Sequence, residues 1–490
     1  MQFPFLSIII FIPLLAGIVI LLLPADQKNW IHGIALGAAG LSFLLSIWVY
    51  ASYNITAGSY QFIEHSPWLP ALGISYYLGV DGISVPLLLM GSLVLLCGVM
   101  ISWKVDDRPR EFFSFMMFLG TSVLGVFSSL DLFELFFFFE LAVFPKYLMI
   151  VVWGSPKTRE YGGMKLTLYL FFGSVLSLIG ALAIYFSSGL HTFDMLALEK
   201  AGFSMDVQRL WFPFVFLGFA ILGGIFPFHS WAPDGHVAAP TAVSMLLAGV
   251  EMKVGAFAAL RVGIMLLPEG ARAWSTWILV LATINVVYGA FIAMIQTDFK
   301  YVIGFSSVSH MGLVLIGFAT LNKTGLMGAS LQMFSHGVMT ALFFSIVGMV
   351  YDRTHTRDIS KLGGLFQKMP WAAICFIIGG LASMGMPGTS GFVAEFPVFM
   401  GVLQTLPLVA IIAAIAIVVT AAYILLVVRR VFFGDLPAEF ANTVTDISVL
   451  DKFTIGMLSM IIIGLGVFPV LMVPLVQSGV SHALTLLGGG

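Results

Sequence analysis

Residues 384–392, MGMPGTSGF, interrupt an apolar run that extends from Pro370 to Leu406. Gly and Pro break a helix, and at bilayer depth the freed backbone groups need neighbouring protein or trapped water as partners. Glu395 follows directly after the interruption. An ionisable residue at such a place marks an ion pathway by default. The pattern therefore predicts a discontinuous membrane helix with a buried carboxylate.

The composition extends this prediction to the whole chain. Of 490 residues, 60% are apolar and only 9% are charged, which is more apolar surface than a soluble fold can bury. A helix needs about 20 apolar residues to cross a hydrocarbon core of about 30 Å, and the sequence holds about 14 runs of this kind. We predict an all-α, polytopic membrane protein with about 14 transmembrane helices, forming a single membrane domain over residues 1–490.

A second interruption lies five runs upstream. Pro227 and Pro240 break the seventh run much as residues 386–396 break the twelfth. Interrupted helices at corresponding positions of two halves are typical of inverted repeats around a site near the membrane midplane. The sequence therefore predicts discontinuous helices 7 and 12.

The basic residues are sorted by loop. Most of the 22 Lys and Arg lie in loops after odd-numbered runs, among them Lys104, Arg353 and Arg429. The positive-inside rule places these loops in the cytoplasm and both termini on the periplasmic side of the cell inner (plasma) membrane. The first run lacks a basic n-region and a cleavage site, so we interpret it as a retained helix. Charges are not pooled in a patch, and we predict no nucleic-acid partner.

The two cysteines do not provide the ligands of a redox centre. Cys97 and Cys375 lie in different apolar runs with no second thiol nearby, so the sequence holds neither a CxxC site nor the ligands of an iron–sulfur cluster. His310 and His336 could clamp a haem between adjacent antiparallel runs, and we keep this as a minor alternative. Otherwise we expect redox chemistry in another chain, and no metal here.

Ionisable residues inside apolar runs are the candidate functional residues. Glu140 stands in FFFFELAVFP (136–145), where an unpaired carboxylate would cost several kcal/mol or take up a proton. Lys146, six residues later, belongs to a different face of a regular helix, although Pro145 bends the local path. A role of Lys146 in a proton path and snorkelling toward the surface both remain open.

The eighth run, MLLAGVEMKVGAFAALR (245–261), contains three more charges. Lys253 is too far from either end to snorkel easily, which favours a functional role. Glu251, two residues away, points elsewhere; it could pair with Lys253 across a neighbouring helix or contact a different subunit. Arg261 is more typical of a structural anchor.

Four histidines lie at bilayer depth or at helix breaks. Histidine titrates near neutrality and suits a proton relay, although a buried histidine can also be a packing residue. We prefer a relay or water-ordering role for His310 and His336, with His229 and His236 at the break of the seventh run. The ionisable groups of five different runs then indicate a proton wire rather than a solute pocket: Glu140, Lys253, His310, His336 and Glu395.

Six motifs in this order resemble one known family. They are GVDGISVPLLLM (79–90), FFFELAVFP (137–145), HSWAPDGHVAAPTAVSMLLAGVEMKVGAFAALR (229–261), QTDFKYVIGFSSVSHMG (296–312), HTRDISKLGG (355–364) and MGMPGTSGFVAEF (384–396). The chain resembles the NuoM-type antiporter-like membrane subunits of respiratory complex I, within the Mrp antiporter superfamily. The resemblance covers nearly the whole chain, from about Tyr77 to Arg430.

The resemblance implies a fourteen-helix fold with two inverted five-helix repeats, over about residues 110–268 and 273–434. It implies a proton-translocating subunit of an NADH:quinone oxidoreductase that contacts other membrane subunits, which would hold the FMN, iron–sulfur clusters and quinone. By motif, Glu140 corresponds to the fifth-helix glutamate, Lys253 to the central lysine and Glu395 to the exit acid. Family histidines correspond to His229, His310 and His336.

One position departs from the family pattern. The family has a lysine seven residues before the FPFHSW histidine, as the partner of the fifth-helix glutamate, and this chain has Leu222 there. Lys146 and Glu251 are extra charges, and we hypothesise that Lys146 replaces the lost lysine as the counter-ion of Glu140. Two alternatives are an Mrp-like cation/proton antiporter subunit and a structural homologue with impaired pumping.

Overall fold

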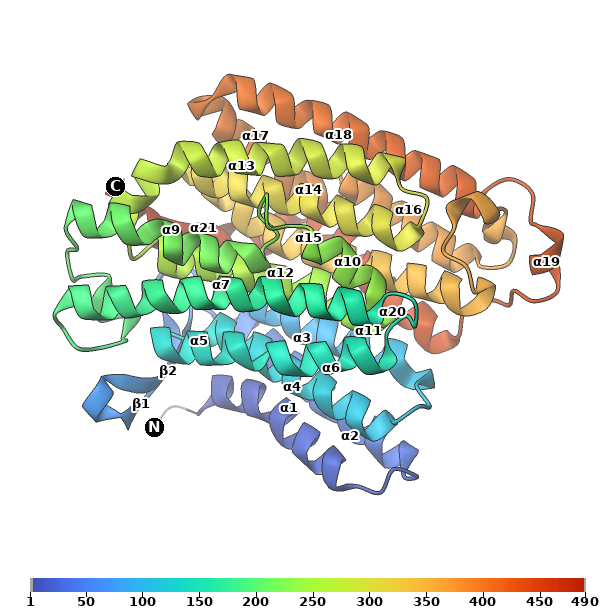
Figure 1. The fold of residues 1–490 in the computed structure, drawn as a ribbon, viewed down its shortest axis with the longest axis horizontal. Coiled ribbons are helices and arrows are strands. Elements are labelled where there is room, and N and C mark those ends of the chain that lie inside the picture. The colour runs from blue at the N-terminus through green and yellow to red at the C-terminus, as the bar shows by residue number, and fades with distance from the viewer. Residues whose placement is uncertain (1–2, 489–490) are drawn as a thin grey trace.

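The computed structural model describes residues 3–488, and most of this part of the chain is helical. Figure 1 shows long helices packed side by side along one common direction, with both ends of the described chain at the same end of the bundle. Within residues 3–488, thirteen helices are long and apolar enough to cross a membrane. They are α1 (Phe5–Leu22), α2 (Lys28–Ser52), α3 (Ser84–Ile101), α4 (Pro109–Ser128), α5 (Leu132–Leu141) continued by α6 (Val143–Trp153), α7 (Arg159–Ser188), α9 (Met205–Leu222), the span Thr241–Ile264, α13 (Pro268–Ile295), α14 (Phe299–Ala319), α15 (Lys323–Thr354), α18 (Pro407–Val427) continued by the π turn η7 (Val428–Phe432), and α20 (Val449–Val467).

The remaining predicted crossing is the interrupted one. The helices α16 (Pro370–Ser383) and α17 (Ser390–Thr405) flank the MGMPGTSGF break, and neither is long enough to count as a full span. The glycines carry the break, because Gly385 and Gly388 adopt φ values of 64° and 90°, which residues with a Cβ rarely reach. The structure confirms the predicted all-α membrane fold and this discontinuous helix 12.

The seventh run is also interrupted as predicted. Helix α9 ends at Leu222, the short helix α10 (Trp231–Ala238) follows, and the next helix begins at Thr241. The side chain of Asn285 from α13 bridges the gap: it accepts the Phe226 N–H and donates to the Gly224 carbonyl at 2.7 Å. Such a bridge is required because backbone groups freed inside a membrane find no bulk water.

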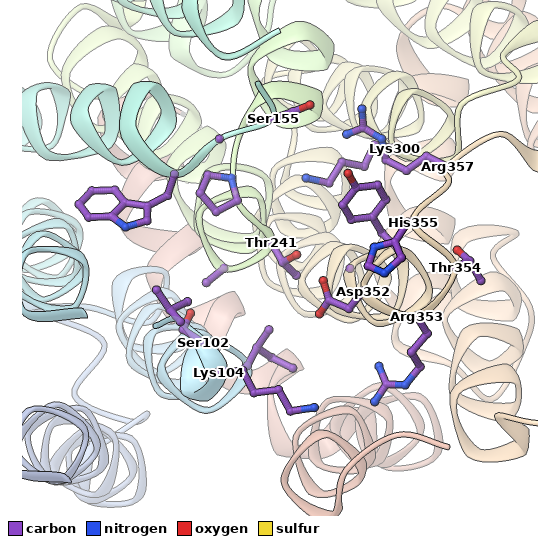
Figure 2. A pocket seen from close by; sticks show the side chains of 18 of the residues that line it. Ser102, Lys104, Ser155, Thr241, Lys300, Asp352, Arg353, Thr354, His355 and Arg357 are labelled. Carbon is purple, nitrogen blue, oxygen red and sulfur yellow. The ribbon is translucent and has the colours of Figure 1, made fainter. Parts of the chain in front are cut away.

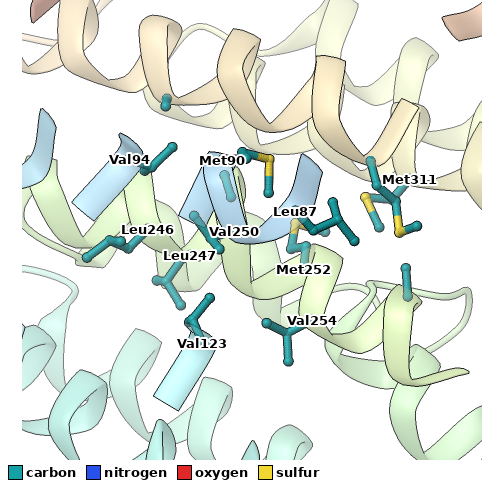
Figure 3. Packing of buried hydrophobic residues seen from close by; sticks show 14 of the residues in the cluster. Leu87, Met90, Val94, Val123, Leu246, Leu247, Val250, Met252, Val254 and Met311 are labelled. Atoms are coloured by element: carbon teal, nitrogen blue, oxygen red, sulfur yellow. The ribbon is translucent and has the colours of Figure 1, made fainter. Parts of the chain in front are cut away.

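The eighth span contains two stretches of π-helix, which the sequence did not predict. It consists of α11 (Thr241–Leu246), η3 (Leu247–Glu251), α12 (Met252–Ala258) and η4 (Ala259–Ile264), of which η3 and η4 are π-helical. The whole span is buried. Figure 3 shows Leu247 and Val250 of η3 among apolar side chains of neighbouring helices, including Met90 and Val123. Single π-helical turns within an α-helix occur frequently at functional sites.

The all-α prediction missed a small hairpin. Strands β1 (Gln61–Leu69) and β2 (Ile74–Val80) pair antiparallel in the aromatic-rich segment before α3. Helix α21 (Val473–Leu486) packs against α15. The remaining short elements are η1 (Pro70–Leu72), η2 (Ser102–Lys104), α8 (Met195–Leu198), η5 (Ile359–Lys361), η6 (Leu365–Gln367), α19 (Ala438–Ala441) and η8 (Pro469–Leu471).

Candidate functional site

Lys253 is buried at the centre of the bundle without an acidic partner. Its side chain on α12 is 0% exposed, and within residues 3–488 no carboxylate lies at ion-pair distance from it. Its Nζ donates to the carbonyl of Ala248, five residues upstream in η3. An ammonium group carries three donors, and burying one with so few acceptors is costly. Burying the neutral amine of Lys253 therefore costs less than burying its ammonium form.

Lys146 and Glu251 form an ion pair inside the membrane region. The Lys146 Nζ on α6 donates to the Glu251 Oε2 at the end of η3, and each side chain is only 1% exposed. Two of our hypotheses are therefore wrong: the Lys146 ion pair is made with Glu251 rather than with Glu140, and Glu251 does not pair with Lys253. The bend at Pro145 is not enough to bring residues six positions apart on one helical path into direct contact, whereas α6 faces η3.

Glu140 remains without a counter-ion. It lies near the end of α5, half-buried, and its Oε1 is buried without a hydrogen-bond partner among the described residues. Leu222, at the position of the missing lysine, is buried at the end of α9. We call Glu140, Lys146 and Glu251 the charge-pair cluster. It contains two carboxylates for one ammonium.

Glu395 belongs to a second cluster, in which no charge is directly matched by a lysine or arginine. It lies on α17 just after the break and is 3% exposed. Its Oε1 accepts a hydrogen bond from the Gln332 amide at 3.1 Å and lies 3.4 Å from the His310 Nε2. Its Oε2 has no partner among residues 3–488. We call Glu395, His310, Gln332 and His336 the histidine–acid cluster.

The surroundings of His310 favour proton exchange with Glu395. Its Nδ1 is 2.8 Å from the Ser306 carbonyl and its Nε2 is 3.2 Å from the Ser383 carbonyl. Carbonyl oxygens only accept, whereas a neutral imidazole has a single N–H to donate. A second proton, exchanged with Glu395, would satisfy both carbonyls. A cavity of about 10 Å³ beside His310 and Glu395 approaches the smallest volume that holds a water molecule.

His336 adjoins His310 but has no polar partner of its own. The two rings are stacked with centroids 5.2 Å apart and an interplanar angle of 14°. Both ring nitrogens of His336 are buried without hydrogen bonds in the described chain. With their ring centroids this close, the two histidines leave no room between them for a haem plane in this arrangement. Within residues 3–488 there is also no cluster of three His, Cys, Asp or Glu suited to a metal ion.

The two histidines at the seventh-helix break differ from this pair. His229 packs between aromatic rings, 5.5 Å from Phe226 and 5.0 Å from Tyr288, and its Nδ1 is buried without a partner. His236 on α10 is fully buried, with neither ring nitrogen hydrogen-bonded. Lys253 lies within electrostatic reach of His236, His310 and His336. A charge on Lys253 therefore acts on histidines at the seventh-helix break and on those of the histidine–acid cluster.

A polar cavity opens at one end of this arrangement. It has a volume of about 1010 Å³ and is lined at the end of α3, after α6, at the start of α11 and at the end of α15. Figure 2 shows Lys104, Asp352, Arg353 and Arg357 around it. These residues belong to the basic loops, so the cavity lies on the face that we predict to be cytoplasmic.

Lys300 joins this cavity to the interior, and the sequence reasoning missed it. It lines the cavity, yet only 5% of its side chain is exposed. Its Nζ donates to the carbonyls of Ala239 at 2.7 Å and His236 at 3.3 Å, and to the Ser244 hydroxyl at 3.2 Å. The available signal was its place near the start of the tenth run, where a lysine is easily interpreted as a loop residue. Asn285 and Gln332 were missed for a similar reason, since each is a single amide in an apolar run.

Arg261 is a structural anchor, as predicted. Its guanidinium lies 2.5 Å from the Asp81 carboxylate, 5.1 Å from the Tyr60 ring centroid and 5.1 Å from that of Phe257. Asp81 also accepts the N–H groups of Ile83 and Ser84 at the start of α3. This pair fastens the eighth span to the third and leaves no free charge.

Comparisons with known proteins agree with this arrangement. Residues 129–422 match the family described as NADH:quinone oxidoreductase/Mrp antiporter, TM. The chain is similar to the NADH-quinone oxidoreductase subunit M of Rhodobacter capsulatus, with 37% identity over 97% of this chain and 96% of that protein. It is also similar to the NAD(P)H-quinone oxidoreductase chain 4 3 of Trichormus variabilis, with 36% identity over 96% of this chain and 89% of that protein.

Two solved structures share the fold. A chain of respiratory complex I from Thermus thermophilus with bound NADH matches with a TM-score of 0.91 and 28% identity, over 99% of this chain and 100% of that one. A chain of the Mrp complex from Dietzia sp. matches with a TM-score of 0.87 over the full length of both chains. Its identity is 19%, so this second likeness concerns the fold alone.

Proposed function

Because the chain belongs to the NADH:quinone oxidoreductase/Mrp antiporter family, we propose that it is a proton-translocating membrane subunit of an NADH:quinone oxidoreductase of the complex I type. The observation that carries this proposal is the buried Lys253 without a counter-ion, next to histidines that lead to a buried acid. Groups of this kind can bind and release protons.

The proposed path begins at the cytoplasmic cavity. A proton enters near Lys300, passes the region of His236 at the seventh-helix break and reaches Lys253. The Lys253 amine binds it as an ammonium and gives it up again when charge changes nearby. Interactions between charges are strong in a low-dielectric interior, so a change at one group shifts the proton affinity of the next.

The exit runs through the histidine–acid cluster. His336 and His310 receive the proton from Lys253, and His310 passes it to Glu395 across the 3.4 Å contact. The glycine-rich break next to Glu395 provides backbone carbonyls and room for water, through which the proton leaves on the periplasmic side.

Energy for this transport would come from partner chains. We propose that other membrane subunits adjoin this one in the cell inner membrane and that FMN, iron–sulfur clusters and quinone are held by partner subunits. Cys97 and Cys375 are both buried and unpaired within residues 3–488, in line with a packing role. This chain would thus act as the translocase part of the enzyme, with both termini on the periplasmic side.

The test is proton pumping by the parent complex in sealed membrane vesicles. With Lys253→Ala we expect NADH-driven pumping to fall about 100-fold while the complex still assembles, because general acid–base groups contribute on this scale. The matched control is Lys323→Ala, the same change at an exposed lysine at the start of α15, which should pump like the native protein. Native pumping by Lys253→Ala would contradict the proposal.

A second candidate function is an Mrp-like cation/proton antiporter subunit, favoured by the family description and by the shared fold. Replacing sodium by choline in the same vesicles separates the two. A redox-driven proton pump should be insensitive to this exchange, whereas an antiporter should require sodium and work without NADH.

A further inference from the structure

The polar cavity on the predicted cytoplasmic face contains an acid without a partner. Asp352 lies in the last turn of α15, is exposed and lines this cavity of about 1010 Å³. It makes no ion pair with any of the residues that the structure describes, whereas the arginines beside it are engaged. Arg353 pairs with Asp451 at 3.4 Å. Arg357 pairs with Asp298 at 3.2 Å. Asp352 is therefore a free carboxylate in an open, polar cavity.

Packing places Asp352 near the entry point of the proposed path. Gly348, one turn earlier on the same face of α15, lies against Thr241 at the start of α11 with no room for a Cβ between them. The Lys300 Nζ donates to the hydroxyl of Ser244, one turn after Thr241 on the same helix, at 3.2 Å. Asp352 and Lys300 thus border the same short stretch of α11. Figure 2 shows Asp352, Thr241 and Lys300 around the cavity that all three line.

Lys300 is poorly placed to collect protons from bulk water by itself. Only 5% of its side chain is exposed, and its ammonium group donates to two carbonyls and one hydroxyl. The other charged or titratable side chains that line the cavity with Asp352 are Lys104 of η2, Arg353 of α15, His355 and Arg357 after α15, and Glu439 of α19. Cations repel an incoming proton, whereas an ionised carboxylate attracts and binds one.

The supply of protons sets a limit that such an acid can lift. The proton concentration at neutral pH is about 10⁻⁷ M, so capture at a diffusion limit of about 10¹⁰ M⁻¹ s⁻¹ brings about 10³ protons per second to one group. Enzymes turn over at rates of up to about 10³ s⁻¹. Direct capture therefore becomes limiting as the pH rises above neutrality. A carboxylate at the cavity can also receive protons from buffer molecules and hand them on.

We propose that Asp352 is the proton-uptake group of this chain, which takes protons from the cytoplasmic water and passes them across the cavity toward Lys300. In each cycle the carboxylate gains one proton, becomes a neutral acid and gives the same proton to water in the cavity beside Lys300. The charge of Asp352 is thereby restored, and no further reactant is needed. The inference rests on the proposed function and names the group that supplies its path.

The test measures NADH-driven acidification inside inverted membrane vesicles, in which the cytoplasmic face contacts the buffer. Asp352→Asn keeps the size of the side chain but cannot bind a proton. At about pH 6, where bulk water supplies about 10⁴ protons per second, this variant should pump like the native protein, which also shows that it assembles. At about pH 8 the supply is about 10² per second, and pumping should fall about tenfold below the native rate. A concentrated, impermeant buffer should restore it, because buffer molecules then deliver the protons.

The matched control is Glu439→Gln, the same acid-to-amide change at the other acid among the lining residues, which lies on the four-residue helix α19. It should pump like the native protein at both pH values. Native pumping by Asp352→Asn at the higher pH would overturn the inference. An equal loss at both pH values would also overturn it, because a structural defect does not depend on the proton supply. An equal effect of Glu439→Gln would contradict the assignment to Asp352. The proposed function fails separately, through native pumping by Lys253→Ala.

Discussion

The charge-pair cluster and the histidine–acid cluster bury ionisable groups in two different ways. In the first, the Lys146 ammonium directly neutralises Glu251, with both side chains 1% exposed. In the second, Glu395 is equally buried but meets only an amide and a histidine. A matched ion pair has little reason to exchange protons, whereas an acid held by neutral donors changes its protonation state easily. From this comparison we propose that the proton is carried by the histidine–acid cluster rather than by the matched pair.

Removing one member of a matched pair should have the largest effect on stability. Asp81→Ala leaves the Arg261 guanidinium buried without its carboxylate and removes two hydrogen bonds at the start of α3. We expect a loss of about 3–5 kcal/mol in unfolding free energy, because a broken buried pair leaves an uncompensated charge. The effect is measured by heating the purified complex and recording the temperature at which this subunit is lost from it. Native stability would show that matched pairs are not structural here.

Removing the exchangeable acid should affect transport instead. Glu395→Gln keeps the size of the side chain but cannot bind and release a proton, so pumping should fall about 100-fold with assembly unchanged. The control is Gln332→Ala, which removes the amide donor to Glu395 but no titratable group, and should slow pumping less. Equal effects of the two variants would contradict the distinction between the clusters.

The two helix breaks can be compared in the same way, and here the predicted loss of stability is smaller. The twelfth-helix break is closed by its own backbone, where the Met386 N–H donates to the Leu381 carbonyl at 2.9 Å, whereas the seventh depends on Asn285. Asn285→Leu leaves the Phe226 N–H and the Gly224 carbonyl unsatisfied and should cost about 1–3 kcal/mol. Hydrogen exchange of the amides around Phe226 should accelerate, while the amides around Met386 keep their native rates.

The sequence predicted the architecture because the determining signals are local. Apolar runs of spanning length, two Gly- and Pro-rich interruptions and six motifs were sufficient for the membrane fold and for the family. The same signals predicted that Lys253 and Glu395 are buried, since an ionisable residue in the middle of an apolar run has nowhere else to go. Their roles in proton transfer remain predictions, as does the division into repeats over residues 110–268 and 273–434.

The partners of these residues could not be predicted, because they depend on which helices adjoin. Lys146 faces η3 rather than Glu140, a choice made by the packing of α6 against the eighth span. The π turns of that span have no distinctive sequence pattern, although they determine that Lys253 meets Ala248. Lys300 was missed because a lysine at the start of an apolar run is expected at the surface, whereas the side chain of Lys300 is buried.

The most direct measurement is infrared difference spectroscopy of the parent complex in vesicles, recorded before and during NADH oxidation. A carboxylic acid and a carboxylate absorb at different frequencies, so the spectrum reports the proton on Glu395 itself. We predict a carboxylic acid band that changes with turnover in the native complex and is absent in Glu395→Gln. A native spectrum in which no such band changes, or one that persists in Glu395→Gln, would contradict the account that this buried acid carries the proton.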